Sequence, residues 1–238
     1  MHHTRHAIFQ TSLITSLAQG VYEDEMMLSE LLGHGSFGIG TFNGLDGEMV
    51  ILDGRCYRLR SDGSVTEPPL DERTPYAVVT NFVPSIREEL TGPLTREEFS
   101  KVVDGFIPSS NYMYALRVTG RFSWASARTV ERQEQPYRPM VEATDGEEVV
   151  RLDNFTGTIA GFRTPLYEAA ISVAGCHAHV INDERTWGGH LVDFVLEKGT
   201  VELCLCTDLQ LRLPLTDEFS AADLGRDMSE EIKQVEHH

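Results

Sequence analysis

Three histidines lie within one short segment of the chain, GCHAHVINDERTWGGHLVDF, which spans residues 175–194. Imidazole nitrogens are frequent zinc ligands. A catalytic zinc keeps one place open for water or substrate, whereas a structural zinc is usually closed by four protein ligands. His177 and His179 are two residues apart, so both project from one face of an extended strand. With His190 as the third ligand and no obvious fourth, the segment predicts an open, catalytic metal site.

The sequence around the three histidines is typical of a β-hairpin, with apolar runs on both sides of a polar, glycine-rich middle. We expect Gly188 and Gly189 to turn the chain back, so that the third histidine faces the other two across the strands. Asp183 and Glu184 are expected in the turn, and Asp193 is a candidate to hydrogen-bond a ligating histidine. The alternative is a surface hairpin that binds no metal, because the pattern HxH is common by chance.

Two further polar residues lie in the glycine-rich segment GIGTFNGLDGEM, residues 38–49. Thr41 precedes the Asp46-Gly47 step, and Glu48 follows it at the start of a predicted strand. Glycines allow the backbone to approach a ligand or another strand closely. Taken alone, however, Glu48 is typical of a solvated carboxylate beside a turn.

Arg128 and Glu236 are weaker candidates when judged by their surroundings alone. Arg128 lies in a predicted strand, where an inward guanidinium would need an anionic partner, although an exposed arginine is the ordinary case. Its planar fork matches a carboxylate in a bidentate manner. Glu236 lies near the C-terminus and, by composition, is typical of a frayed surface residue.

The chain is strongly acidic, with 238 residues and a formal net charge of -17 at pH 7. This charge disfavours nucleic acids and anionic membrane surfaces as partners. An anionic substrate would require local positive charge, from a metal and a well-placed arginine. Polar residues interrupt the apolar segment at residues 8–18 too often for a signal peptide, so we expect a soluble, cytoplasmic protein.

The four cysteines contain no CxxC pair, which argues against a zinc ribbon or a thioredoxin motif. Cys204 and Cys206 are two residues apart on a predicted strand, and we expect both to be buried as small apolar residues. The histidine pairs at the two ends of the chain, at positions 2, 3, 237 and 238, are not candidate metal ligands.

The elements that must position these residues are mainly strands. Three Asp-Gly steps between short apolar runs, at residues 46–63, predict an antiparallel meander. One helix is expected within YEDEMMLSELLGHG, ending at Gly33, and another at Thr95, which forms a capping box with Glu98. Further strands are expected at residues 111–130 and 149–162. The C-terminal DMSEEIKQVE has a helical pattern, but extension or fraying is equally compatible with it.

This order of elements predicts an α+β, β-rich protein with a few helices. We expect two closely packed domains of mixed or antiparallel β-sheet, at residues 1–131 and 132–238. The boundary is suggested by RQEQPYRPMVEATDGEE, which is rich in proline and charge. The second domain would carry the histidine hairpin and the C-terminal tail.

The sequence resembles the acetolactate decarboxylase family over nearly the entire chain. The segments that carry the resemblance are IFQTSLITSLAQGVYE, GIGTFNGLDGEM, TPYAVVTNF, ALRVTGRF, ARTVERQEQPYRPM, GTIAGFRTP, GCHAHVINDERTWGGH and the terminal KQVE. One departure is Glu131 in ARTVERQ, where the family pattern has proline.

The resemblance implies a role for each candidate residue. It implies that His177, His179 and His190 bind Zn²⁺, or another divalent transition metal in its place. Glu48 is similar to the active-site glutamate after the turn, and Arg128 to the arginine that faces the substrate. Glu236 resembles the glutamate that the C-terminal tail returns to the site, and Thr41 a substrate contact. The family also implies two β-rich domains and a homodimer.

The implied reaction is the decarboxylation of 2-acetolactate, a 2-hydroxy-3-keto acid, to acetoin, a step toward butanediol. In this reading zinc chelates the hydroxyl and ketone oxygens, and its charge stabilises the enediolate that remains after loss of carbon dioxide. Arg128 orients the carboxylate, and Glu48 or Glu236 delivers a proton to one face of the enediolate.

Two alternatives stay open from the sequence. His177, His179 and Glu184 match the HxHxxxxE spacing of a cupin-like metal oxygenase, although the second glycine-rich motif of that class is missing. The other alternative is an acidic, β-rich module that binds a metal or ligand without turnover.

Overall fold

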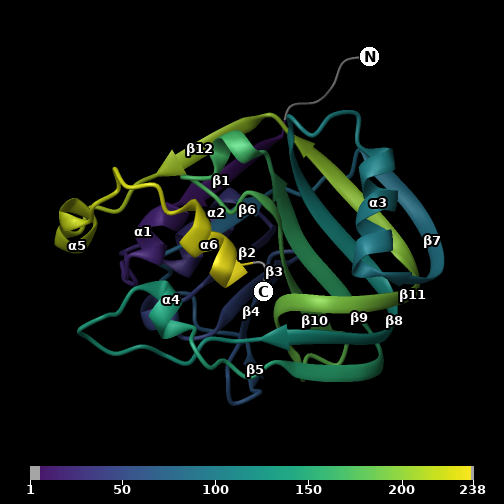
Figure 1. The fold of residues 1–238 in the computed structure, drawn as a ribbon, viewed down its shortest axis with the longest axis horizontal. Coiled ribbons are helices and arrows are strands. Elements are labelled where there is room, and N and C mark those ends of the chain that lie inside the picture. The colour runs from purple at the N-terminus through teal and green to yellow at the C-terminus, as the bar shows by residue number, and fades with distance from the viewer. Residues whose placement is uncertain (1–5, 237–238) are drawn as a thin grey trace.

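The computed structural model describes residues 6–236, and the terminal histidines at positions 2, 3, 237 and 238 lie outside them. The chain forms two β-sheets with a few short helices around them, as Figure 1 shows. This confirms the predicted α+β, β-rich class. No helix among the described residues is long and apolar enough to cross a membrane.

The first sheet has seven strands in the order β12-β1-β6-β2-β3-β4-β5. Its strands are β1 (Ala7–Thr11), β2 (Phe37–Thr41), β3 (Glu48–Leu52), β4 (Arg55–Leu59), β5 (Val65–Thr66), β6 (Ala77–Thr80) and β12 (Asp208–Arg212). The pairing of β1 with β12 is parallel, and the other pairings are antiparallel. The meander predicted from the Asp-Gly steps is therefore the part β3-β4-β5.

The second sheet has five strands in the order β10-β9-β8-β11-β7, and β10 also pairs with β11. Its strands are long: β7 (Ile86–Thr95), β8 (Met113–Arg128), β9 (Val150–Thr164), β10 (Gly175–Asn182) and β11 (Gly188–Cys206). All of its pairings are antiparallel. Cys204 and Cys206 are fully buried on β11, as predicted.

Each sheet takes strands from both sides of residue 132. The five-stranded sheet joins β7 and β8 to β9, β10 and β11, and the seven-stranded sheet takes β12 from the C-terminal part. The division into domains at residues 1–131 and 132–238 therefore does not coincide with the sheets, and it stays a prediction.

The helices are short and lie outside the sheets. They are α1 (Ile14–Ala18), α2 (Leu28–His34), α3 (Arg96–Phe106), α4 (Met140–Ala143), α5 (Asp217–Ala221) and α6 (Ser229–Glu236), with 3-10 turns η1 (Asn43–Leu45) and η2 (Leu166–Glu168). The capping box of Thr95 and Glu98 is present at the start of α3.

Helix α2 differs from its prediction at both ends. It begins at Leu28, and the acidic residues before it are not helical, because Asp24 is buried and accepts a hydrogen bond from the Thr11 hydroxyl at 3.1 Å. It also continues through Gly33 to His34. A side chain at Gly33 would meet no atom within 4 Å, so nothing in the packing requires glycine to end the helix there.

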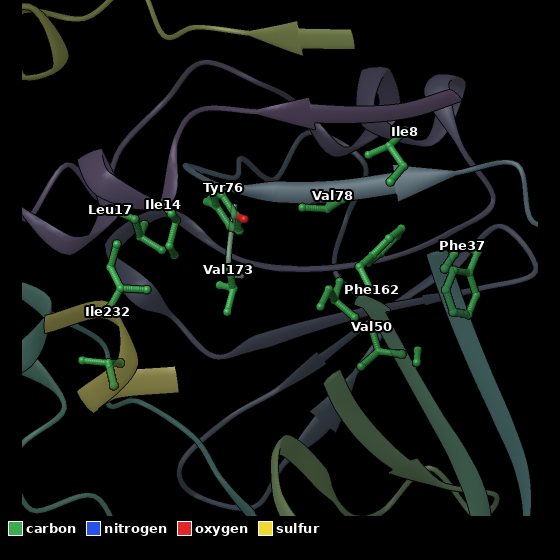
Figure 2. Packing of buried hydrophobic residues seen from close by; sticks show 14 of the residues in the cluster. Ile8, Ile14, Leu17, Phe37, Val50, Tyr76, Val78, Phe162, Val173 and Ile232 are labelled. Atoms are coloured by element: carbon green, nitrogen blue, oxygen red, sulfur yellow. The ribbon is translucent and has the colours of Figure 1, made fainter. Parts of the chain in front are cut away.

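One apolar core is shared by the two sheets and the helices α1, α4 and α6. Figure 2 shows Ile14 and Leu17 of α1 on the same side of this core as Ile232 of α6, with Val50 and Phe162 further along it. The residues that α6 contributes, Ile232 and Val235, are almost completely buried. The C-terminal segment is therefore a docked helix, which fixes the position of Glu236 at its end.

Candidate metal centre and active site

The histidine hairpin brings the three imidazoles together. His179 on β10 and His190 on β11 are a direct cross-strand pair, and His177 is two residues before His179 on the same face. The ring centroids are 5.1 Å apart for His177 and each of the other two, and 5.6 Å apart for His179 and His190. One nitrogen from each ring lies within 4.8 Å of the others. These residues form the cluster expected from their spacing.

The turn of this hairpin is not where the glycines predicted it. The chain turns at Asn182–Trp187: the Asn182 side-chain carbonyl accepts from the N–H groups of Thr186 and Trp187, both at 2.9 Å. Gly188 and Gly189 are already part of β11. A Cβ on Gly188 would lie 2.3 Å from the Val180 carbonyl oxygen, so this glycine permits close strand contact instead of a turn.

The orientation of His179 is fixed by the seven-stranded sheet. Its Nδ1 lies 2.9 Å from the carbonyl oxygen of Met49 on β3. This leaves Nε2 facing the other imidazoles, buried and without a hydrogen bond, 3.3 Å from Glu48 Oε2. The Met49 carbonyl supplies the bond that orients His179, while the carboxylate of Asp193, our candidate for this role, accepts from the N–H of Phe194.

The two inner histidines are held in the form that a metal needs. Burial, reinforced by His177, lowers the pKa of His179 to about 3. Burial and the neighbouring histidines also place the pKa of His190 well below its ordinary value. Both rings are therefore neutral at physiological pH, as ligation of a divalent cation requires. Four-coordinate nitrogen ligands about 2.1 Å from zinc are about 3.4 Å apart, so small side-chain shifts would close this cluster on an ion.

Two glutamates from opposite ends of the sequence face the histidines. Glu48, at the start of β3, lies against His179, and Glu236 Oε2 is 3.3 Å from His177 Nε2 and 3.8 Å from His190 Nδ1. Burial, and then the charges of Glu147 and Glu236, raise the pKa of Glu48 well above its ordinary value. This environment favours the protonated form of the Glu48 carboxyl group, which is the form that can donate a proton.

Arg128 and Thr41 also line this cavity. Arg128 is the last residue of β8 and pairs across the strands with His190. Its side chain is only 12% exposed, and its Nε lies 3.5 Å from Glu147 Oε2. Thr41 is the cross-strand partner of Glu48, and its hydroxyl donates to the Gly47 carbonyl at 2.8 Å.

Glu147 is a buried member of the site that sequence reasoning missed. Its side chain is 8% exposed, and Oε1 is buried with no hydrogen-bond partner among the described residues. Burial raises its pKa to about 7, Arg128 opposes this rise, and Glu236 adds to it. The sequence indicated only a proline- and charge-rich domain boundary here, and the lack of an apolar pattern gave no sign that Glu147 points inward.

The raised pKa of Glu147 predicts a dependence of stability on pH. Because the folded protein holds this proton more tightly than the unfolded chain, the associated stability is complete below about pH 4.5 and is lost as pH rises through about 7. The free energy of unfolding of Glu147→Gln, relative to the unmodified chain, should therefore rise between pH 5 and pH 7.5. Urea unfolding of both metal-free proteins at the two pH values checks this, and a constant difference would contradict it.

Two of the cavities at this site adjoin Arg128. The inner one, of about 50 Å³, is lined by the three histidines, both glutamates, Thr41, Arg128, Glu147 and apolar residues of α1, α4 and α6. The outer one, of about 410 Å³, lies over the end of β8 and the loop at residues 143–150. Arg128 and Glu147 are the two residues that line both cavities. Glu131, the departure from the family pattern, lines the outer cavity only.

Comparison with known proteins places this arrangement in a family. The family model described as alpha-acetolactate decarboxylase matches residues 8–226. The chain belongs to the alpha-acetolactate decarboxylase family. The Bacillus subtilis (strain 168) alpha-acetolactate decarboxylase is 44% identical over 230 residues, which cover 96% of this chain and 90% of that protein. The one from Raoultella terrigena is 42% identical over 237 residues, with coverages of 99% and 92%.

Solved structures of alpha-acetolactate decarboxylases have the same fold. The crystal structure of the Bacillus subtilis strain 168 enzyme matches with a TM-score of 0.95 and 43% identity, and covers 98% of this chain and 100% of that one. A Staphylococcus aureus protein described as similar to the family matches with a TM-score of 0.92 and 31% identity, with coverages of 97% and 100%. Family membership makes this chain a carboxy-lyase that acts on acetolactate.

The two alternative functions lose their support. Glu184, which the cupin-like reading required as a ligand, is exposed in the turn between β10 and β11. Among the described residues, the group that could hold a metal consists of the three histidines alone. A binding module without turnover does not fit a full-length relationship to decarboxylases.

Proposed function

We propose that the chain converts 2-acetolactate to acetoin at the inner cavity, with a divalent transition metal, most naturally zinc, on His177, His179 and His190. The observation that carries the proposal is the orphaned, buried Nε2 of His179, which faces two other imidazoles and belongs to a neutral ring. When bound, the metal would supply Lewis-acid stabilisation of the negative charge that develops on the substrate oxygens.

Arg128 binds and orients the substrate carboxylate in this account. Its guanidinium is the positive side chain that lines the inner cavity, and the rest of the charged lining is acidic. A planar guanidinium holds a carboxylate through two parallel hydrogen bonds, which fixes the bond to be broken relative to the ketone. The acidic surface of the chain makes such a local cation necessary for an anionic substrate.

Glu48 delivers the proton in this account. Loss of carbon dioxide from a β-keto acid leaves an enediolate, which must take up a proton on one carbon to become acetoin. Burial and the nearby carboxylates raise the pKa of Glu48, which favours the protonated form that donates. Its position on one side of the cavity accounts for a product of one handedness, while Glu236 stays against His177 and His190.

A substitution at Glu48 tests this assignment. Glu48→Gln keeps the size of the side chain but removes its acidic proton, and we expect acetoin formation to slow by about a hundredfold or more. Glu67→Gln, at an exposed residue just after β5 of the same sheet, is the matched control and should keep its rate. An acetoin assay on acetolactate, with metal content measured on the same samples, separates loss of the donor from loss of metal. An unchanged rate in Glu48→Gln would remove Glu48 from the mechanism.

We further propose that the chain acts as a cytoplasmic homodimer. Large apolar side chains are strongly exposed at Leu166, Tyr167 and Leu215, and a second copy of the chain would cover such residues. Light scattering should give twice the chain mass of 26.6 kDa. A mass equal to one chain would refute the dimer, and fractionation of the source cells tests the location.

A further inference from the structure

The inner and outer cavities share an ion pair in their linings. Arg128 and Glu147 are the residues common to both linings, and their charged groups lie 3.5 Å apart between the two spaces. The inner cavity, of about 50 Å³, has room for a few water molecules. A five-carbon keto acid needs more space than this, and we infer that part of the wall moves when it binds.

Glu147 belongs to the part of the wall that can move with little cost. It lies in the loop between Ala143, where α4 ends, and Val150, where β9 begins. The preceding Gly146 has φ +84 and open space around its Cβ position. Arg128, in contrast, is held by the strand ladder opposite His190. Displacement of Glu147 breaks no strand pairing, whereas displacement of Arg128 would disturb the histidine hairpin.

The contact between the two side chains is weak for a buried pair. At 3.5 Å it is longer than a charge-assisted hydrogen bond of about 2.7–2.9 Å, and the other carboxylate oxygen of Glu147 is buried without a hydrogen-bond partner. Burial of an ionised carboxylate with one oxygen unsatisfied is costly. The raised pKa of Glu147 is consistent with this poor solvation.

We propose that Glu147 is a stand-in for the substrate carboxylate: it pairs with Arg128 until the substrate binds, separates the two cavities, and is displaced into the outer cavity by the substrate. The inference rests on the proposed role of Arg128. A buried guanidinium stays charged and needs an anion nearby. Glu147 meets this need before the substrate arrives, but it then competes for the same group. It therefore lowers the affinity for carboxylates and acts as a specificity-determining residue.

The competition predicts an effect that depends on the charge of the ligand. The probe is 2-hydroxy-2-methylpropanoate, which carries the carboxylate and the tertiary hydroxyl but has no ketone, so it cannot be decarboxylated. Acetoin, which is neutral, is the matched ligand. In Glu147→Gln the dissociation constant of the carboxylate should fall by about five- to tenfold, while that of acetoin should change by less than about twofold.

Calorimetric titration of the metal-loaded proteins measures both constants. Glu148→Gln is the matched control, because it removes the same charge one residue further on, and this residue lines the outer cavity alone. We expect it to change the affinity for the carboxylate by less than about twofold. If Glu148→Gln tightened binding as much as Glu147→Gln, a general effect of net charge would replace the proposed competition.

A third variant separates failure of this inference from failure of the proposed function. Arg128→Ala should weaken binding of the carboxylate and leave the affinity for acetoin unchanged. If it does so while Glu147→Gln leaves the affinity for the carboxylate unchanged, the stand-in role of Glu147 is wrong and the proposed role of Arg128 is retained. If Arg128→Ala leaves the affinity for the carboxylate unchanged, both the stand-in role of Glu147 and the proposed role of Arg128 are wrong. Equal tightening of acetoin and the carboxylate in Glu147→Gln would also overturn the inference, because it would indicate a loosened wall.

Discussion

Replacement of His179 by alanine should abolish stoichiometric metal binding and lower kcat/KM for acetolactate by about a thousandfold or more. His179 is a strongly constrained member of the three proposed ligands, since it is buried, Met49 fixes its ring, and His190 is its cross-strand partner. With two imidazoles left, the cluster lacks the three protein ligands that an open catalytic site uses. Elemental analysis after gel filtration and an acetoin assay measure the two effects.

His34→Ala is the matched control for the loss of a histidine. His34 lies in α2 and stacks on Phe9, away from the residues that line the inner cavity. We expect this variant to retain one metal ion per chain and its activity. Full metal content in His179→Ala, with His34→Ala unchanged, would show that the metal lies elsewhere.

Arg128→Ala should have the second largest effect, a loss of about a hundred- to thousandfold in kcat/KM with metal content retained. The reason is that the truncation removes the cation that we propose to orient the carboxylate, and leaves Glu147 buried without its counterion. A lysine at this position keeps the charge but loses the planar fork, so Arg128→Lys should recover only part of the activity.

Arg121→Ala is the control on the same strand. Arg121 is exposed on β8 and pairs with Glu197, and a surface pair of this kind contributes little to stability. Steady-state kinetics and metal analysis of the three variants test the prediction together. Activity in Arg128→Ala within about threefold of the unmodified chain would contradict the assigned role.

Local sequence patterns predicted the parts of the site that lie within one hairpin. The spacing of His177 and His179 placed them on one strand face, and the apolar flanks predicted the second strand with His190. The helix that begins after Thr95 was predictable for the same reason, because its capping box is made by residues three apart. The spacing of the histidines and the capping box each depend on residues that are close in the sequence, so they can be recognised from one sequence alone.

The contacts between distant segments could not be predicted from local patterns. Glu48 and Glu236 are brought to the histidines by the seven-stranded sheet and by α6, and their positions were expected from the family resemblance alone. Neither a local pattern nor the family resemblance indicated Glu147. Its burial results from the loop between α4 and β9, which brings it against Arg128. The turn of the hairpin was misplaced because Asn182, instead of the glycines, supplies its hydrogen bonds.

The central claim is tested most directly by titration of metal into protein that a chelator has stripped of metal. If the three imidazoles hold the ion on which decarboxylation depends, acetoin formation from acetolactate should be absent without metal. It should then rise linearly with added zinc and level off at one equivalent per chain. Full activity in protein shown by elemental analysis to be free of metal would contradict the account.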